Sequence, residues 1–321
     1  MKTFFRALSV IVLLCTTSMA VAETYPERPV RFIVPAGPGG VIDVLARIVA
    51  KKLSENFGRP FFVENIPGAG HNIGMGTAAK AKPDGYTILV AASTLMVNPM
   101  IFASVPYDPI RDFAPVSLLG VSHFVLVVNP QVPADNAAEL IALIKASPGK
   151  YNFASYGVGT TPHLLGELLR ISFDLDLVHV PFNGAGPAIN STLAGSTPIF
   201  FAGPTMAVQL VKQGKLRALA VTSKVRLTEL PDVPTVAEAG LPGEGADTMI
   251  GILVPAGTPR EIVDALHREI SKITAMPDVR ERFAALGVEP VSNTPEEFGT
   301  YIKAEIVRWG KVVHDAKIRN E

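Results

Sequence analysis

One turn decides the fold of this chain: Pro35-Ala36-Gly37-Pro38-Gly39-Gly40, followed directly by Val41-Ile42-Asp43. Before the turn, residues 29–34 are short, β-branched and apolar, which is typical of a buried strand. After it, residues 41–57 carry apolar side chains with the period of an amphipathic helix. A strand, a tight turn and a helix N-terminus predict an anion site, because free backbone N–H groups and the positive end of the helix dipole face the same point.

The N-terminus has the organisation of a secretory signal peptide. Lys2 and Arg6 give it positive charge, residues 7–19 form a short apolar stretch, and Ala20-Val21-Ala22 matches a cleavage site with small residues. We therefore expect residues 1–22 to be a signal peptide that is cleaved near Ala22, and the mature protein to be exported.

The composition of the mature chain excludes several classes of function. Without Lys2 and Arg6 the 29 basic residues become 27 against 29 acidic residues, a formal net charge of −2. A near-neutral chain without a basic run argues against binding to nucleic acid or to a membrane surface. The single cysteine, Cys15, lies in the leader, so the mature chain has neither a disulfide nor a thiol nucleophile.

Strand-like and helical patterns alternate along the mature chain, which predicts an α/β fold with mostly parallel sheets. The strand-like segments are residues 31–34, 61–64, 87–91, 124–129, 151–155, 177–180, 199–202, 218–222 and 249–254. The helical patterns are residues 41–57, 73–81, 134–147, 162–171, 259–275, 277–286 and 295–317, with one more helix from Pro187. The proline-rich residues 98–115 are predicted to form a loop.

The order of these elements predicts two lobes that are joined by a hinge. The first lobe would hold residues 23–124 plus 248–321, and the second lobe would hold residues 125–247. Two chain crossings between the lobes would make a hinge that is suited to closing on a ligand. No sequence repeat indicates a solenoid or a propeller.

Two glycine-rich turns in the second lobe repeat the pattern of the first. Residues 155–162 follow a predicted strand and precede a helix that Thr160 or Thr161 can cap and that Pro162 fits at its first turn. Asn183-Gly184-Ala185-Gly186-Pro187 has the same form. Ligands of open α/β sheets bind at the carboxyl ends of the strands, where these turns lie. Taken singly, such a turn is most often only a turn, but one in each lobe predicts a facing pair.

Four side chains beside these turns have both a structural and a functional interpretation. His163 is either a packing histidine or a neighbour of the site that orients the glycine loop. Asp43 lies in the first turn of its helix, where the dipole favours a carboxylate by about 0.3–1 kcal/mol, so it is expected to brace the turn. Ser93 and Thr94 are either ligand-binding hydroxyls or ordinary loop residues.

The usual signatures of nucleotide, metal and catalytic sites are missing from the sequence. Residues 68–74 resemble a dinucleotide fingerprint but have one residue too many before the last glycine. The six histidines form no metal-binding spacing, so we expect no metal and no cofactor. An exported hydrolase that uses Ser93, Ser155 or His163 remains an alternative, although nothing pairs a nucleophile with a base and an orienting acid.

A colinear set of motifs covers nearly the whole mature length. Its members are Tyr25–Pro29, Pro35–Asp43, Pro67–Gly70, Lys82–Thr87, Tyr107–Pro109, Phe113–Val116, Gly159-Thr160 with His163-Leu164, Val180–Phe182 with Gly186-Pro187, Leu230–Glu238 and Pro255–Pro259. In these motifs the chain resembles the Bug-type (TctC-like) periplasmic receptors of tripartite tricarboxylate transporters. The resemblance implies a type II-like two-lobed periplasmic binding fold, a receptor and not an enzyme, and a monomer.

In such receptors the turns that match residues 35–43 and 157–163 clamp a carboxylate, largely through backbone N–H groups and water. The closed receptor then docks on a small and a large membrane subunit. The resemblance and the turns together give these candidate ligand-binding residues: Ala36, Gly39, Gly40, Asp43, Ser93, Thr94, Ser155, Gly157, Gly159, Thr160, Thr161, His163, Asn183 and Ala202. A ligand-sensing partner of a membrane kinase would use the same site and remains an alternative.

Two departures from the family pattern bear on the ligand. Relatives often have Phe or Tyr where this chain has Ala36, which leaves room here for a bulkier ligand such as an aromatic carboxylate or a longer dicarboxylate. Members that bind amino acids place an Asp for the ligand's amine where this chain has Ala202. Because an amine without a partner is disfavoured, the ligand is predicted to be a carboxylate other than an amino acid.

Overall fold

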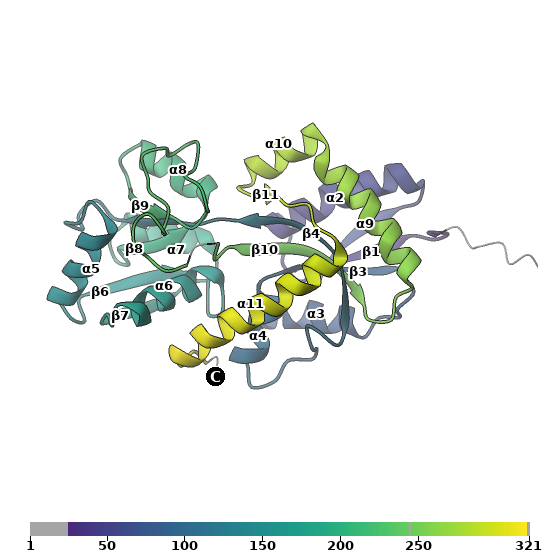
Figure 1. Ribbon diagram of the computed structural model, residues 1–321, viewed down its shortest axis with the longest axis horizontal. Helices are drawn as coiled ribbons and strands as arrows, with labels where there is room; N and C mark the ends of the chain where they lie inside the picture. The colour runs from purple at the N-terminus through teal and green to yellow at the C-terminus, as the bar shows by residue number, and fades with distance from the viewer. Residues whose placement is uncertain (1–24, 244, 320–321) are drawn as a thin grey trace, which may run out of the picture.

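The computed structural model describes residues 25–243 and 245–319. The predicted signal peptide lies outside the described residues. The chain forms two lobes along the long axis of the molecule, each with one β-sheet between helices (Figure 1). The two-lobed α/β prediction is therefore confirmed.

The sheet of the first lobe has six strands in the order β11-β4-β10-β3-β1-β2. The strands are β1 (Val30–Val34), β2 (Phe61–Asn65), β3 (Thr87–Ala92), β4 (Phe113–Ser122), β10 (Thr248–Pro255) and β11 (Glu289–Pro290). The helices that flank this sheet are α2 (Val41–Phe57), the 3-10 turn η1 (Ala69–His71), α3 (Asn72–Ala79), α4 (Thr94–Ile101), α9 (Arg260–Ala275) and α10 (Pro277–Ala285).

The sheet of the second lobe has five strands in the order β7-β6-β8-β5-β9. The strands are β5 (Val125–Val128), β6 (Tyr151–Ser155), β7 (Leu177–Pro181), β8 (Ile199–Ala202) and β9 (Arg217–Val221). Its helices are α5 (Ala137–Ala146), α6 (Thr161–Ser172), α7 (Ala185–Leu193) and α8 (Pro204–Lys212).

Both sheets are mixed, so the expectation of mostly parallel sheets was too strong. β1 pairs in parallel with β2 and β3, and β6 pairs in parallel with β7 and β8. In contrast, β10 runs antiparallel to β3 and β4, and β5 runs antiparallel to β8 and β9. The antiparallel pairs involve the strands through which the chain changes lobes.

Three segments connect the lobes. The chain leaves the first sheet at Ser122 and enters the second at Val125, and it returns to the first sheet at Thr248. The third connection is α11 (Pro295–Asp315), which runs from the first lobe to the second (Figure 1). Its Trp309 is fully buried and belongs to the hydrophobic core of the second lobe.

Residues 98–115 form the predicted loop only in their middle part, residues 102–112, because the neighbouring elements extend into both ends of the range. Helix α4 extends to Ile101 with Pro99 inside it, and β4 begins at Phe113. Proline removes a backbone donor and normally ends a helix. Here α4 is short and buries Leu95, Met96 and Val97 against the core, so tertiary packing outweighs the local signal.

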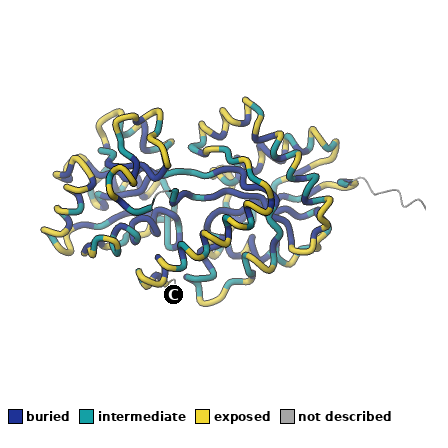
Figure 2. The backbone as a smooth tube through the Cα atoms, in the orientation of Figure 1, coloured by how far each residue is buried: buried dark blue, intermediate teal, exposed yellow. Residues whose placement is uncertain are grey.

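Burial follows the sheets. The strands run through the interior of both lobes, and exposed residues concentrate on the outer helices and loops (Figure 2). The largest fully buried side chains are Trp309, Phe32, Phe153, Phe200, Phe283 and Phe298. One buried cluster joins Val97 and Ile101 of α4 to the core of the second lobe, so α4 and α11 pack the two lobes together on one side.

Candidate functional site

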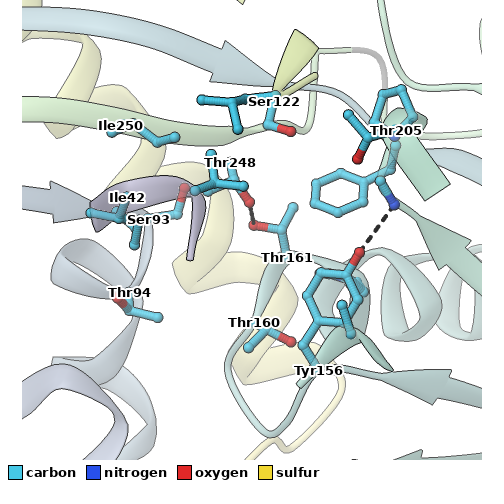
Figure 3. Close-up of a pocket in the computed structure, with 18 of the residues that line it drawn as sticks. Ile42, Ser93, Thr94, Ser122, Tyr156, Thr160, Thr161, Thr205, Thr248 and Ile250 are labelled. Carbon is cyan, nitrogen blue, oxygen red and sulfur yellow. Dashed lines mark hydrogen bonds between the residues drawn. The ribbon is translucent and has the colours of Figure 1, made fainter. Parts of the chain in front are cut away.

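A cavity of about 250 Å³ lies between the lobes, and we call it the inner compartment. Both lobes contribute to its walls (Figure 3). Its lining residues are Val41, Ile42, His71, Ala92, Ser93, Thr94, Ser122, Phe124, Tyr156, Thr160, Thr161, Pro162, Ala185, Gly203, Pro204, Thr205, Met206, Thr248, Ile250 and Leu286.

Five helices begin at the wall of this compartment. The first lobe contributes the N-termini of α2 and α4, and the second lobe contributes those of α6, α7 and α8. The first N–H groups of a helix have no partner within the helix, and the helix dipole makes this end positive. The convergence of the N-termini therefore favours an anionic ligand over a cationic one.

The side chains of the inner compartment carry no formal charge. Among the described residues, its lining includes no Asp, Glu, Lys or Arg. Several of its hydroxyls are engaged by the protein itself: Thr161 Oγ1 and Thr248 Oγ1 lie 2.7 Å apart, and Ser93 Oγ accepts a 2.9 Å bond from a backbone N–H. Any charge recognition in this compartment therefore comes from the helix ends.

A second cavity of about 440 Å³, the outer compartment, adjoins the first. The two share His71, Thr94, Tyr156 and Thr160. The other residues that line the outer compartment are Ala69, Gly70, Phe102, Gly157, Val158, Pro181, Phe182 and Asn183. Neither compartment is lined by a charged side chain among the described residues.

His71 and Tyr156 supply the titratable groups where the compartments meet. His71 has a left-handed backbone with φ 81°, and its Nδ1 lies 2.9 Å from Thr94 Oγ1. Burial lowers the pKa of His71, so it is neutral at neutral pH. Burial raises the pKa of Tyr156 to about 12, and its hydroxyl accepts a 3.0 Å bond from the Gly203 N–H. Sequence reasoning missed both residues, because their positions depend on long-range packing.

The opening turn is braced by Asp43. The buried carboxylate accepts bonds from the Gly39 N–H at 2.9 Å and from Asn65 Nδ2 at 2.9 Å, and Asn65 also donates to the Ala36 carbonyl. Arg47 forms an ion pair with Asp43 at 2.9 Å. Burial alone would raise the pKa of Asp43, but the bonds from Arg47, Gly39 and Asn65 outweigh it and lower the pKa. Asp43 therefore acts in the way expected of a brace.

The turn itself borders the cleft without forming its wall. Ala36, Gly39, Gly40 and Asp43 line neither compartment, whereas the next residues along α2 line the inner one. The Gly39 N–H is already donated to Asp43, so it is not available to a ligand. The N–H groups of the first turn of α2 remain, since Gly40 at the N-cap has no side chain to accept from them.

The two glycines at the end of this turn should respond differently to alanine. Gly39 has φ 84°, which costs an L-residue about 1 kcal/mol or more, whereas Gly40 has φ −76° and no close neighbour. Gly39→Ala should lower the free energy of unfolding by this amount, and Gly40→Ala should leave it nearly unchanged. Urea unfolding measures both, and equal losses would contradict the assigned backbone conformation.

The turn of the second lobe is also held from within. The Gly157 N–H donates to Ser155 Oγ at 3.0 Å, and the Gly159 N–H donates to His163 Nδ1 at 3.1 Å. These two N–H groups therefore hold the turn in this conformation, although Gly157 itself lines the outer compartment. Thr160 and Thr161 do line the inner compartment.

Behind this turn two histidines stack on each other. The rings of His163 and His179 lie 3.8 Å apart at 16°, and Phe153 stacks on His179. Burial, together with the neighbouring His179 and Arg170, lowers the pKa of His163 to about 3. Burial lowers the pKa of His179 to about 4. Both rings are therefore neutral at neutral pH. His163 packs against His179 and also accepts the Gly159 N–H, so it orients the glycine loop as well as packing behind it.

Acid should weaken the fold through these two histidines. Both folded pKa values lie below the ordinary value of 6.5. At pH values between the folded and the ordinary pKa, the unfolded state therefore binds more protons than the folded state. The contribution of these two histidines to the free energy of unfolding should be complete above pH 6.5 and should be lost as the pH decreases toward 4. The expected slope is up to about 1.4 kcal/mol per histidine per pH unit, measurable by urea unfolding.

A double variant provides the control for this pH dependence. His163→Asn combined with His179→Gln keeps polar atoms near the ring nitrogens that bond Gly159 and Ser155, but does not titrate. Most of the acid dependence should disappear in it. A wild-type slope in the double variant would assign the acid sensitivity to other groups.

Ser155 Oγ lies 2.7 Å from His179 Nε2, a distance at which a serine nucleophile and its base would interact. Ser155 is fully buried, however, and lines neither compartment. Its hydroxyl bonds the backbone of Gly157. The pair thus supports the turn from behind, and a substrate in the cleft would not reach it in this conformation.

The remaining candidates divide between the cavity wall and the core. Ser93 and Thr94 line the inner compartment, and Asn183 lines the outer one. Ala202 is fully buried in an apolar cluster of the second lobe and lines neither. Ala202 therefore does not decide whether a carboxylate faces the cleft. The residues that line the two compartments decide it, and none of those described is Asp or Glu.

Two kinds of feature are absent from the described residues. Within residues 25–243 and 245–319, no group of three or more His, Cys, Asp or Glu side chains is arranged to hold a metal ion. In the same part of the chain, no helix has the length and apolar character needed to cross a membrane.

Comparison with known proteins assigns this chain and its fold to a class of solute receptors. Residues 45–318 match the model of the tripartite tricarboxylate transporter family receptor, TctC, and the chain belongs to this family. Among its relatives is Protein BugT of Bordetella pertussis strain Tohama I, which is 38% identical over 97% of this chain and 97% of its own length.

Two solved structures of similar proteins hold a ligand. Rpa4515 of R. palustris, solved with adipate, is 31% identical, covers 92% of this chain and 99% of its own, and has a TM-score of 0.81. MatC of Rhodopseudomonas palustris, with bound malate, is 31% identical, covers 90% of this chain and all of its own (100%), and has a TM-score of 0.76. Both ligands are carboxylates.

Proposed function

We propose that this protein is a periplasmic receptor that binds a small organic carboxylate in the inner compartment. The observation that carries the proposal is the convergence of five helix N-termini on a cavity whose described walls hold no charged side chain. Such a site stabilises an anion through backbone N–H groups and helix dipoles. The carboxylates held by two relatives, adipate and malate, support the same class of ligand.

The ligand of this chain is a carboxylate other than an amino acid. An ammonium group in the cavity would face positive helix ends and would find no Asp or Glu in the described lining. Burying a charge without a partner is strongly disfavoured. This argument does not depend on any single residue, because both compartments lack an acidic side chain among the described residues.

The body of the ligand is apolar or aromatic. Phe124, Met206, Ile250 and Leu286 line the inner compartment. Because hydroxyls such as that of Ser93 are bonded within the protein, these walls offer mainly apolar contact. A carboxylate with an alkyl or aryl body would place its charge at the helix ends and its body against these side chains.

Matched pairs of ligands test the amine prediction. Succinate and aspartate differ only in the ammonium group, as do glutarate and glutamate. We expect the dicarboxylate of each pair to raise the midpoint of thermal unfolding, since a bound ligand stabilises the fold, and the amino acid to leave it unchanged. Tight binding of aspartate or glutamate by isothermal titration would overturn the prediction.

A second set of ligands tests the body of the molecule. Hexanoate and adipate have the same chain length and differ by one carboxylate, and benzoate adds an aromatic ring. Tighter binding of hexanoate or benzoate than of adipate is expected from the apolar walls. Preference for adipate would contradict the apolar body while leaving the carboxylate site in place.

The receptor is proposed to act as a monomer and to deliver its ligand to the small and large membrane subunits of a tripartite transporter, without catalysis. Family membership supports this role. Ligand that is recovered unchanged after incubation, and uptake into vesicles that carry the two subunits only when the receptor is added, are the expected results. Uptake without the receptor, or turnover of the ligand, would contradict the role.

A further inference from the structure

A histidine links the segments through which the chain passes between the lobes. His123 lies in the first crossing, between β4 and β5, and Asp247 lies in the second, directly before β10. His123 Nδ1 lies 3.0 Å from Asp247 Oδ2, and His123 Nε2 lies 2.7 Å from Glu289 Oε2. One imidazole therefore joins both crossings and the edge strand β11 of the first lobe.

Asp247 also bonds to Thr222, which in turn bonds to the backbone of the first crossing. Asp247 Oδ1 accepts a 2.8 Å bond from Thr222 Oγ1, and this hydroxyl accepts a 2.9 Å bond from the Phe124 N–H. Thr222 and Phe124 also bond through their backbones at 2.9 Å. His123, Asp247 and Thr222 thus form one buried network at the place where the lobes must rotate.

The network lies directly behind the floor of the inner compartment. Ser122 and Phe124, on either side of His123, line that compartment, and so does Thr248, which follows Asp247. His123 itself lines a neighbouring groove, which shares Pro204 and Thr205 with the inner compartment. A change in spacing between the two crossings would therefore move three residues of the cavity wall.

From this geometry we propose that His123 is a positioning residue of the cleft: as an imidazolium it donates to Glu289, pairs through its charge with Asp247 and holds the two crossings at a fixed spacing, and its deprotonation releases the lobes. The Nδ1 atom lies within ion-pair distance of Asp247 but makes no hydrogen bond, so its attraction to this carboxylate depends on the positive charge of the ring. The neutral ring loses this attraction, which favours separation of the segments. The expected effect of His123 on affinity rests on the proposed function, in which the cleft is the ligand site. The expected effect on the distance between the lobes does not.

The charged surroundings of the network favour the cation. Burial alone would lower the pKa of His123, but Asp247 and Glu289 outweigh it and raise the pKa. The groove beside His123 also contains Arg226 and Glu229. Tyr301 and Glu305 of α11 also interact electrostatically with Asp247, and Arg308 pairs with Glu305. A raised folded pKa means that the stabilisation is fully present below pH 6.5 and is lost as the pH rises through the folded value.

The distance between the lobes is the direct test, and it needs no ligand. Phe62 on β2 and Val178 on β7 are exposed, and the only native cysteine is in the leader. Spin labels on Phe62→Cys and Val178→Cys would report the inter-lobe distance at about pH 5.5 and about pH 9. We expect a single distance at the lower pH and a shift to a broader, longer distribution at the higher pH.

Variants decide whether His123 is the cause. In His123→Gln the distance distribution should no longer depend on pH, and Glu289→Gln, at a more exposed position, should shift the transition to lower pH. His314→Gln changes an exposed histidine far from the hinge and should behave as the wild type. Full pH dependence in a folded His123→Gln, or no effect of Glu289→Gln, would overturn the proposal.

Affinity for benzoate and adipate, titrated over the same pH range, adds a second readout. Affinity should fall with rising pH in the wild type and stay level in His123→Gln. If neither ligand binds at any pH while the distances change as expected, the ligand assignment fails and the positioning role of His123 stands. If binding occurs but its pH profile is identical in both proteins, the positioning role fails and the receptor function stands.

Discussion

Ala185→Trp should abolish carboxylate binding, with a loss of affinity of about 100-fold or more, while the protein remains folded. Ala185 is the first residue of α7, lines the inner compartment and is only partly buried. An indole at this position would occupy the space between the lobes and block their closure. Its own helix would tolerate it, because the side chain would extend into the cavity and not into the core.

A control on the same helix separates blocking from a general effect of tryptophan. Asn190 is exposed on α7 and lines neither compartment. Asn190→Trp should bind carboxylates as the wild type does. Isothermal titration of both variants, with circular dichroism to verify folding, makes the comparison. Equal affinities in Ala185→Trp and the wild type would place the ligand outside the inner compartment.

Trp309→Ala should cause the largest loss of stability of any single change considered for this protein, about 3–5 kcal/mol. Trp309 is fully buried in the core of the second lobe although α11 begins in the first. Removal of the ring leaves a cavity and also removes the 2.8 Å bond from Trp309 Nε1 to the buried Glu305 carboxylate. Both losses lower the free energy of unfolding.

Trp309→Phe is the matched variant for this prediction. It retains much of the ring but not the N–H, so its loss should be clearly smaller than that of alanine. Urea unfolding at neutral pH gives both values. A loss below about 1 kcal/mol for Trp309→Ala would mean that the end of α11 is not part of the second core.

Much of the fold could be predicted because local signals agree with the packing. Helix α2 spans the predicted residues 41–57, since Gly40 precedes it and Gly58 ends it in a left-handed conformation with φ 67°. β6 and β8 also match their predicted limits. In these segments the apolar period, the turn residues and the burial indicate the same structure.

The candidate site was predictable only in part. Thr160 and Thr161 lie in the cavity wall as their predicted position at a helix N-terminus suggested, and Thr94, singled out after a predicted strand, lies there too. His71 and Tyr156 were missed, because nothing local indicates that distant strands bring them together. The glycines were expected to donate to a ligand, but Gly39 donates to a carboxylate four residues later. A sequence shows that a turn has free donors, but not which acceptor within the protein takes them.

The hydrogen bond between Thr161 and Thr248 has a consequence for the resting state of the receptor. It joins α6 of the second lobe to the first residue of β10 in the first sheet. A bond of this kind contributes about 0.5–1.5 kcal/mol, enough to shift a two-state equilibrium up to about tenfold. The bond therefore shifts the equilibrium between open and closed lobes toward the closed form. In the proposed transport role, a receptor that closes without its ligand would compete with the loaded receptor for the membrane subunits, which would set a floor on the ligand concentration at which uptake becomes efficient.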